Sequence, residues 1–119
     1  MTAIHETEVI EPFDAVVSHV EGCTIVALHG EIDMTVAPTL RTTLERLVAD
    51  GHVDLVLDLS ELLFIDSSGL SAFIAANRAA CAGGGGLRLR SPRPNTMWVL
   101  ETTRLSDLIP IEERERESG

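Results

Sequence analysis

Residues 62–70 read LLFIDSSGL. This stretch decides the fold because it marks the point where an apolar, strand-like run ends and a helix begins. The run ends at Asp66, and a helical pattern of apolar residues begins directly after it. Aspartate is a preferred N-cap residue, since its carboxylate accepts a hydrogen bond from an otherwise unpaired amide of the first turn. We therefore predict a helix over residues 67–81, with Asp66 as its N-cap and with Ser67 and Ser68 in its first turn.

Strands and helices alternate on both sides of this junction. Residues 53–59 alternate apolar and polar side chains, which is typical of a half-buried strand. Apolar residues at helical spacing over 40–48 predict a helix that begins near residues 35–38 and ends at Asp50-Gly51. The other expected elements are two strands around a turn at Glu21-Gly22, a strand after a glycine run, a third helix and an edge strand, over residues 15–20, 24–29, 87–90, 94–102 and 109–111.

The order of these elements is β-β-α-β-α-β-α-(β). Strands that alternate with helices indicate crossover connections and therefore a largely parallel sheet. The strict alternation along residues 53–59 and 87–90 indicates that one face of the sheet is partly in contact with water. We predict an α/β fold with a mixed, mostly parallel sheet of four to five strands, an N-terminal antiparallel hairpin and helices mainly on one face.

The length of 119 residues fits one domain that buries enough apolar surface to fold without a disulfide or a metal. Residues 1–12 are polar and end at Pro12, so we expect a flexible N-terminal arm there. We expect the folded domain over residues 13–111 and a charged, disordered tail over residues 112–119.

The charge excludes several classes of function. The chain has 19 acidic residues against nine basic ones, all arginine, and its net charge is −10. Such a charge disfavours nucleic acid and anionic membranes as partners and favours a basic protein surface. The four histidines show no metal-ligand spacing, and we expect no metal and no cofactor. The chain opens with neither a signal-peptide pattern nor an apolar run of membrane-spanning length, so we expect it in the cytoplasm.

Two interpretations of the Asp66–Gly69 segment are open at this point. In the first, it is only a helix cap, because Asp and Ser are ordinary cap residues. In the second, a serine hydroxyl in the first turn carries a phosphate, because free amides and the positive end of the helix dipole stabilise an anion there. Gly69 lowers helix propensity by up to about 1 kcal/mol, which suggests the close approach of another surface.

A second segment favours the phosphate. Residues 29–33 read HGEID and stand between a strand and a helix, with Leu40 seven residues downstream of Asp33. Together with the DLSELLFIDSSGL block of residues 58–70, this pattern resembles the anti-sigma factor antagonists of bacteria, which are single-domain proteins of the STAS group. The resemblance extends from about residue 16 to residue 111.

The resemblance implies a regulatory switch in transcription, in stress response for example. In that family, an anti-sigma factor that is also a serine kinase binds the unphosphorylated antagonist and releases its sigma factor. Phosphorylation of the serine after the motif aspartate, here Ser67, prevents binding, and a phosphoserine phosphatase reverses it. The implied binding surface for the partner comprises Asp33, Met34, Thr35, Asp66, Ser67, Ser68 and Gly69. We expect a monomer or a weak dimer that is not itself an enzyme.

The chain departs from the family pattern at three places. Ser71 stands where glycine is usual after the serines, and Arg104 stands where glycine often precedes the last leucine. The last helix carries Pro94 and Trp98, where many relatives have charged or aliphatic residues. We expect Trp98 to anchor this helix in the core.

Two other functions compete with the switch. One is a STAS subunit of an ABC-type lipid-transport complex, although the complete serine block disfavours it. The other is a small nucleotide-binding protein that uses Asp33 and Asp66 near a helix N-terminus. The absence of lysine and of a phosphate-binding loop disfavours this second alternative. A serine hydrolase is disfavoured because no G-x-S-x-G elbow surrounds Ser67.

Overall fold

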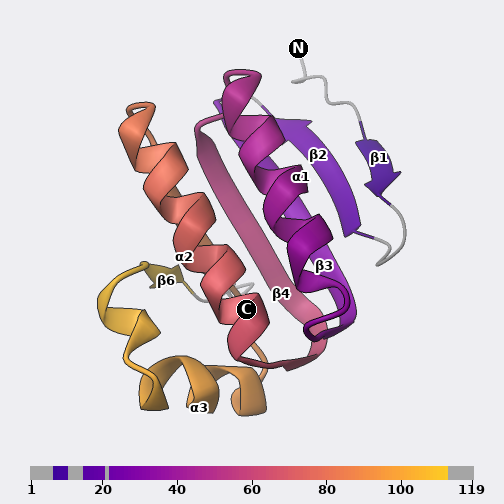
Figure 1. Cartoon of the computed structure of the whole chain (residues 1–119), viewed down its shortest axis with the longest axis vertical. Helices are drawn as coiled ribbons and strands as arrows, with labels where there is room; N and C mark the ends of the chain where they lie inside the picture. The colour runs from indigo at the N-terminus through magenta and orange to yellow at the C-terminus, as the bar shows by residue number, and fades with distance from the viewer. Residues whose placement is uncertain (1–6, 11–14, 21, 113–119) are drawn as a thin grey trace, which may run out of the picture.

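A single mixed sheet with the strand order β1-β2-β3-β4-β5-β6 forms the centre of the molecule (Figure 1). The computed structural model describes residues 7–10, 15–20 and 22–112. The strands are β1 (Thr7–Ile10), β2 (Ala15–Val20), β3 (Cys23–Ile32), β4 (Asp54–Ile65), β5 (Gly86–Arg90) and β6 (Ile111–Glu112). The helices are α1 (Ala37–Ala49), α2 (Ser67–Ala82), α3 (Pro94–Thr102) and the short 3₁₀ helix η1 (Leu105–Asp107).

The pairing of the strands confirms the predicted fold class. β1, β2 and β3 pair antiparallel, whereas β3, β4, β5 and β6 pair parallel to one another. Because α1 connects β3 to β4 and α2 connects β4 to β5, each parallel pair is joined by a helical crossover. The predicted hairpin is the β2–β3 pair.

The expected flexible arm over residues 1–12 needs a correction. Residues 7–10 of it form β1, which pairs with β2 from Ser18 to Ala15 and brings the sheet to six strands. β2 would otherwise leave a row of backbone groups unpaired at the edge of the sheet, and β1 provides partners for them. The rest of the arm lies outside the described residues, as do residues 113–119 of the expected tail, and Glu112 belongs to β6.

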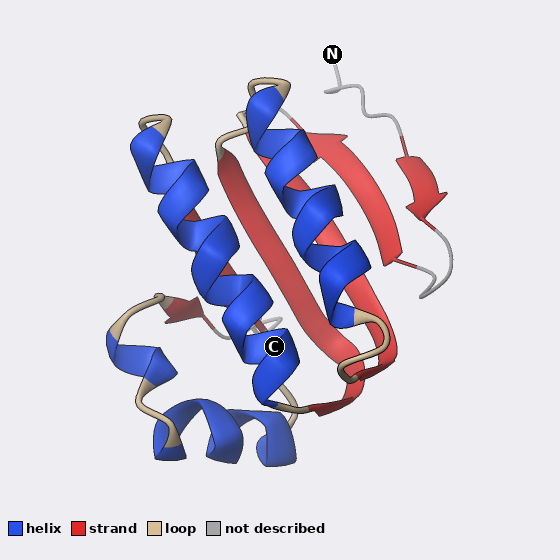
Figure 2. Ribbon diagram, in the orientation of Figure 1, coloured by secondary structure: helices blue, strands red, loops and turns tan. Residues whose placement is uncertain are grey.

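The helices α1 and α2 lie side by side over one face of the sheet (Figure 2). Leu55, Leu57 and Leu59 of β4 are fully buried beneath them, as the alternation predicted. On the opposite face, Asp58 is half-buried, but Val56 is only 2% exposed. Val56 lies in register between Ile25 of β3 and Arg88 of β5, and we attribute its burial to these two larger neighbours.

The third helix, α3, lies across the end of the sheet where α2 begins (Figure 1). The prediction that Trp98 anchors it in the core is wrong, because the Trp98 side chain is 66% exposed. The buried residues of α3 are Thr96 and Leu100, one turn apart on the inner face. Trp98 follows Thr96 by two residues, which places it about 200° round the helix, on the outer face. No helix within the described residues is long and apolar enough to cross a membrane.

Candidate functional site

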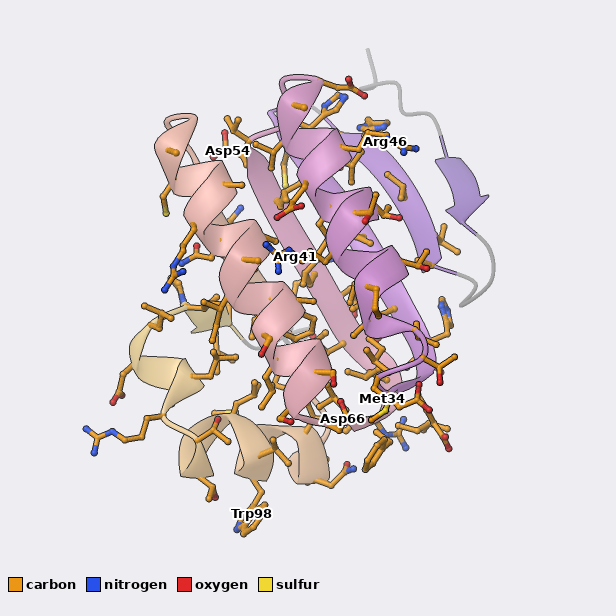
Figure 3. All side chains as sticks on the ribbon, viewed as in Figure 1. Met34, Arg41, Arg46, Asp54, Asp66 and Trp98 are labelled. Carbon is orange, nitrogen blue, oxygen red and sulfur yellow. The ribbon has the colours of Figure 1, made fainter. Side chains whose placement is uncertain are left out.

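The two predicted site segments meet at the carboxyl ends of β3 and β4. The backbone amide of Asp66 donates to the carbonyl of Ile32 at 3.1 Å, and this bond places the start of α2 beside the loop after β3. Figure 3 shows Met34 and Asp66 at this end of the molecule. Parallel pairing of neighbouring strands therefore brings together residues that are 33 positions apart in the sequence, Asp33 and Asp66.

Asp66 is the N-cap of α2, which confirms the prediction. Its Oδ1 accepts hydrogen bonds from the amides of Ser68 at 2.8 Å and Gly69 at 3.3 Å. Its backbone carbonyl accepts the first helical bond from Leu70 at 3.1 Å. The carboxylate thus fixes the direction of the first turn of α2 and, with it, the position of both serines.

Asp33 holds the turn that precedes α1, whose N-cap is Val36. Its Oδ1 accepts hydrogen bonds from the amides of Thr35 at 3.0 Å and Val36 at 3.3 Å, and its carbonyl accepts from Ala37 at 2.8 Å. Asp33 is half-buried, whereas Met34 and Thr35 are exposed. Both motif aspartates therefore hold local backbone, and each still presents its second carboxylate oxygen at the site.

The two serines differ in their surroundings. Ser67 is exposed. Ser68 is half-buried and lines a hollow of about 350 Å³ between α1 and α2, together with Met34, Arg41 and Ser71. A protein that reaches this end of the molecule therefore meets the Ser67 side chain first.

Gly69 is buried, and the close approach that it permits lies inside the protein. A Cβ atom at this position would lie 2.6 Å from Cγ1 of Ile65 and 2.8 Å from Cγ2 of Ile32. This gives Gly69 a task inside the fold, while its contact with a partner stays a prediction. Its lack of a side chain lets α2 start directly over the ends of β3 and β4.

The site is acidic, and two amides of the first turn of α2 are already bonded within the chain. We expected free amides at the start of α2 to stabilise a phosphate, but the amides of Ser68 and Gly69 are bonded to Asp66. The Nε of Arg41, which lines the neighbouring hollow, pairs with Oε2 of Glu45 at 3.1 Å. A phosphate on Ser67 would thus project into solvent next to a carboxylate.

Two functional candidates, Leu63 and Phe64, escaped the sequence interpretation. Both belong to the apolar run that ends at Asp66, yet they are 51% and 48% exposed. The parallel register places Gly30 opposite Leu62 and Glu31 opposite Phe64, so Leu63 is an extra residue in β4. Such a bulge redirects neighbouring side chains, and a run of apolar letters carries no signal of it. Within the described residues, no group of three His, Cys, Asp or Glu side chains is placed to hold a metal ion.

Comparison with known proteins shows the family of the chain. The model of the STAS domain matches residues 14–118. The anti-sigma-B factor antagonist of Bacillus subtilis is 34% identical over 86 residues, which cover 72% of this chain and 78% of that protein.

Solved structures of anti-sigma factor antagonists share the fold of this chain. An anti-sigma factor antagonist from Mycobacterium paratuberculosis is 27% identical, with a TM-score of 0.67 over 94% of this chain and 90% of that one. The Bacillus antagonist SpoIIAA is 18% identical and shares the fold in both its unphosphorylated and its phosphorylated form. The TM-scores are 0.70 and 0.64 over 95% of this chain and over 90% and 93% of the SpoIIAA chains.

Proposed function

The chain belongs to the STAS domain family, and from that premise we propose that it is an anti-sigma factor antagonist controlled by phosphorylation of Ser67. In its unphosphorylated form it binds an anti-sigma factor that is also a serine kinase, and the sigma factor is released. Phosphorylated Ser67 prevents binding, and a phosphoserine phosphatase restores it. In this role the chain is a regulator and a kinase substrate, and not itself an enzyme.

The exposed Ser67 hydroxyl, directly after the capping Asp66, is the observation that carries the proposal. A kinase active site needs a hydroxyl that can approach ATP in line, and the first turn of α2 offers one without unfolding the helix. Ser68 is less suited because it is half-buried beside the α1–α2 hollow.

The same geometry supports a partner surface around Ser67. Met34 and Thr35 are exposed beside it, and Asp33 and Asp66 each keep one carboxylate oxygen outside their bonds to backbone amides. A phosphate adds about −1.5 to −2 charges among these acids. Since the amides of Ser68 and Gly69 are already bonded to Asp66, these two amides do not neutralise that charge.

The test is a kinase assay with each serine-kinase anti-sigma factor of the source organism and ATP, followed by mass spectrometry of the Ser67 peptide. We expect stoichiometric phosphate on Ser67 in the wild type and in Ser68→Ala, and none in Ser67→Ala. Phosphate that persists in Ser67→Ala and disappears in Ser68→Ala would assign the switch to the other serine. No phosphorylation by any of these kinases would overturn the switch.

A further inference from the structure

Large apolar side chains are exposed at the end of the molecule that carries Ser67. Among the described residues, six such side chains are exposed, and four of them are Met34, Leu63, Phe64 and Trp98. Their exposed fractions are 71%, 51%, 48% and 66% in that order. We call these four residues the apolar band.

Contacts between elements connect the members of the band. Phe64 lies in register with Glu31 of β3, two residues before Asp33. The side chain of Asn95 donates from Nδ2 to the carbonyl of Leu63 at 3.0 Å, which ties α3 to the bulge of β4. Trp98 follows Asn95 by three residues and so lies one turn further along the same face of α3. The band therefore extends from the loop after β3, past the bulge, to the outer face of α3.

Neither aromatic member of the band, Phe64 or Trp98, is buried in the hydrophobic core. Phe64 and Leu63 point outward because of the bulge, and Trp98 lies opposite the buried Thr96 and Leu100. Figure 3 shows Trp98 projecting from the lower end of the molecule. Exposed tryptophan and phenylalanine side chains that cluster in one region are typical of the centre of a protein–protein interface.

Charged residues border the band, and most of them are acidic. Glu31, Glu61 and Glu101 are exposed around it, and Asp33 and Asp66 lie beside Met34. Arg93, the N-cap of α3, is turned back to donate to the carbonyl of Ser60 at 3.2 Å. An apolar centre with a mainly acidic rim fits a partner that presents an apolar pocket with a basic rim.

We propose that the apolar band binds the anti-sigma factor next to the Ser67 site and that Trp98 is its main anchor and a determinant of partner choice. This inference rests on the proposed function. It assigns binding affinity and control by phosphorylation to different residues. The band provides most of the affinity, whereas Ser67 controls whether the surfaces can close. Trp98 takes this task in a chain whose last helix departs from the family pattern at that position.

The test uses the anti-sigma factor that phosphorylates the chain. Its affinity for the wild type, for Trp98→Ala and for Leu108→Ala is measured by calorimetric titration. Leu108 is the matched control because its side chain is 53% exposed and it belongs to a different surface, beside Cys81 and Pro110. We expect Trp98→Ala to weaken binding at least about thirtyfold, the scale of an interface hot spot, and Leu108→Ala to change it less than about threefold. Thermal melts of all three proteins should agree within about 3 °C, because both side chains are exposed.

A second measurement observes the anchor directly. Trp98 is the single tryptophan of the chain, so incorporation of fluorotryptophan gives one fluorine NMR signal from this protein. We expect that signal to shift and broaden when the unphosphorylated protein binds, and to stay unchanged when the Ser67-phosphorylated protein is mixed with the same partner.

Trp98→Ala that binds as tightly as wild type, while phosphorylation of Ser67 still abolishes binding, would overturn the band and leave the proposed function intact. Equal weakening by Leu108→Ala would also overturn it. Failure of the wild type to bind any of these anti-sigma factors would overturn both proposals.

Discussion

At the scale of single residues, the site combines a structural and a functional demand on the same side chains. Asp33 and Asp66 each hold two backbone amides through one carboxylate oxygen, so replacing either one changes the loop as well as the surface. Loss of the Asp66 helix cap costs about 1 kcal/mol. A binding defect in an Asp33 or Asp66 variant is therefore weaker evidence for direct contact than a defect in Trp98→Ala.

Gly69 is the residue at which the fold tolerates least change. Alanine is favoured over glycine in a helix by up to about 1 kcal/mol, but here its Cβ would overlap Ile65 and Ile32. Overpacking of this kind costs about 1–3 kcal/mol. We predict that Gly69→Ala lowers the free energy of unfolding by about 1–2 kcal/mol in urea titrations.

A double-mutant cycle isolates the cause. Ile65→Ala removes the two atoms, Cγ1 and Cδ1, that a Cβ at residue 69 would meet at 2.6 Å and 2.9 Å. Gly69→Ala should therefore cost clearly less in the Ile65→Ala background than in wild type. Equal costs in the two backgrounds would show that the overlap with Ile65 is not the reason.

The backbone conformation of Arg104 gives a reason for the glycine that the family often has at this position. Its φ of 66° lies in the left-handed region, which glycine adopts at little cost and other residues rarely adopt. This conformation explains why glycine often precedes the last leucine in the family that the sequence resembles. In this chain an ion pair from Arg104 Nε to Asp107 Oδ2 at 3.0 Å accompanies the arginine.

At the scale of elements, β4 connects the stability of the sheet to the site. Its first half pairs with β5, and on the face without helices Asp58 pairs with Arg90, with Oδ2 and Nη2 3.5 Å apart. Its second half carries the bulge and ends at the α2 cap. The same strand therefore contributes core residues along its whole length and exposes Leu63 and Phe64 at its irregular end.

The Asp58 carboxyl makes stability depend on pH. Burial alone raises its pKa, but hydrogen bonds from Ser60 and the nearby Arg90 guanidinium together hold the pKa below its ordinary value of 3.8. A carboxyl whose pKa is lower in the folded chain stabilises the fold above its unfolded-state pKa, and this contribution declines as pH falls through the folded-state pKa.

We predict that Asp58→Asn lowers the free energy of unfolding near neutral pH by up to about 1 kcal/mol. The difference from wild type should shrink as pH falls below the ordinary value of 3.8. Urea titrations at neutral pH and at about pH 3 measure both quantities. Arg90→Gln, which keeps the Ser60 hydrogen bonds, should give a smaller loss, and a pH-independent effect of Asp58→Asn would contradict the assignment.

At the scale of the whole molecule, the sheet separates the core from the surface that we propose for binding. Most of the buried residues of the sheet lie beneath α1 and α2, whereas Ser67 and the apolar band lie at the end where α2 begins. A charge added at that end does not enter the core. The switch that we propose would therefore act by changing a surface while the fold stays the same.

We predict that Ser67→Asp weakens binding of the anti-sigma factor about a hundredfold, because a charge is then buried among carboxylates in the interface. Its melting temperature should stay within about 3 °C of wild type, since Ser67 is exposed. Ser67→Asn is the matched control, because an asparagine side chain has nearly the same size as aspartate but carries no charge.

Calorimetric titrations and thermal melts of the three proteins decide between mechanisms. A loss of affinity that is equal in Ser67→Asp and Ser67→Asn would indicate a steric effect. A large drop in melting temperature for Ser67→Asp alone would indicate that the switch works by unfolding the start of α2.

The sequence by itself determined the order of the strands and α-helices from β2 to β6, the cap of α2 and the two motif segments. These features depend on local chemistry: the alternation of residues 53–59 predicts a strand, and an aspartate before a helical pattern predicts a cap wherever it occurs. The predicted range of the third helix, residues 94–102, matches both ends of α3. The motif resemblance then identified Ser67 as the residue of interest, since local pattern could not separate it from Ser68.

Only the tertiary structure decided which apolar residues are buried. Leu63 and Phe64 are exposed because the β3–β4 register leaves an extra residue in β4, and Trp98 is exposed because α3 buries Thr96 and Leu100 instead. Gly69 is buried because the ends of β3 and β4 lie beneath the first turn of α2. Burial depends on which surfaces meet across long sequence separations, and a side chain's own hydrophobicity does not specify its neighbours.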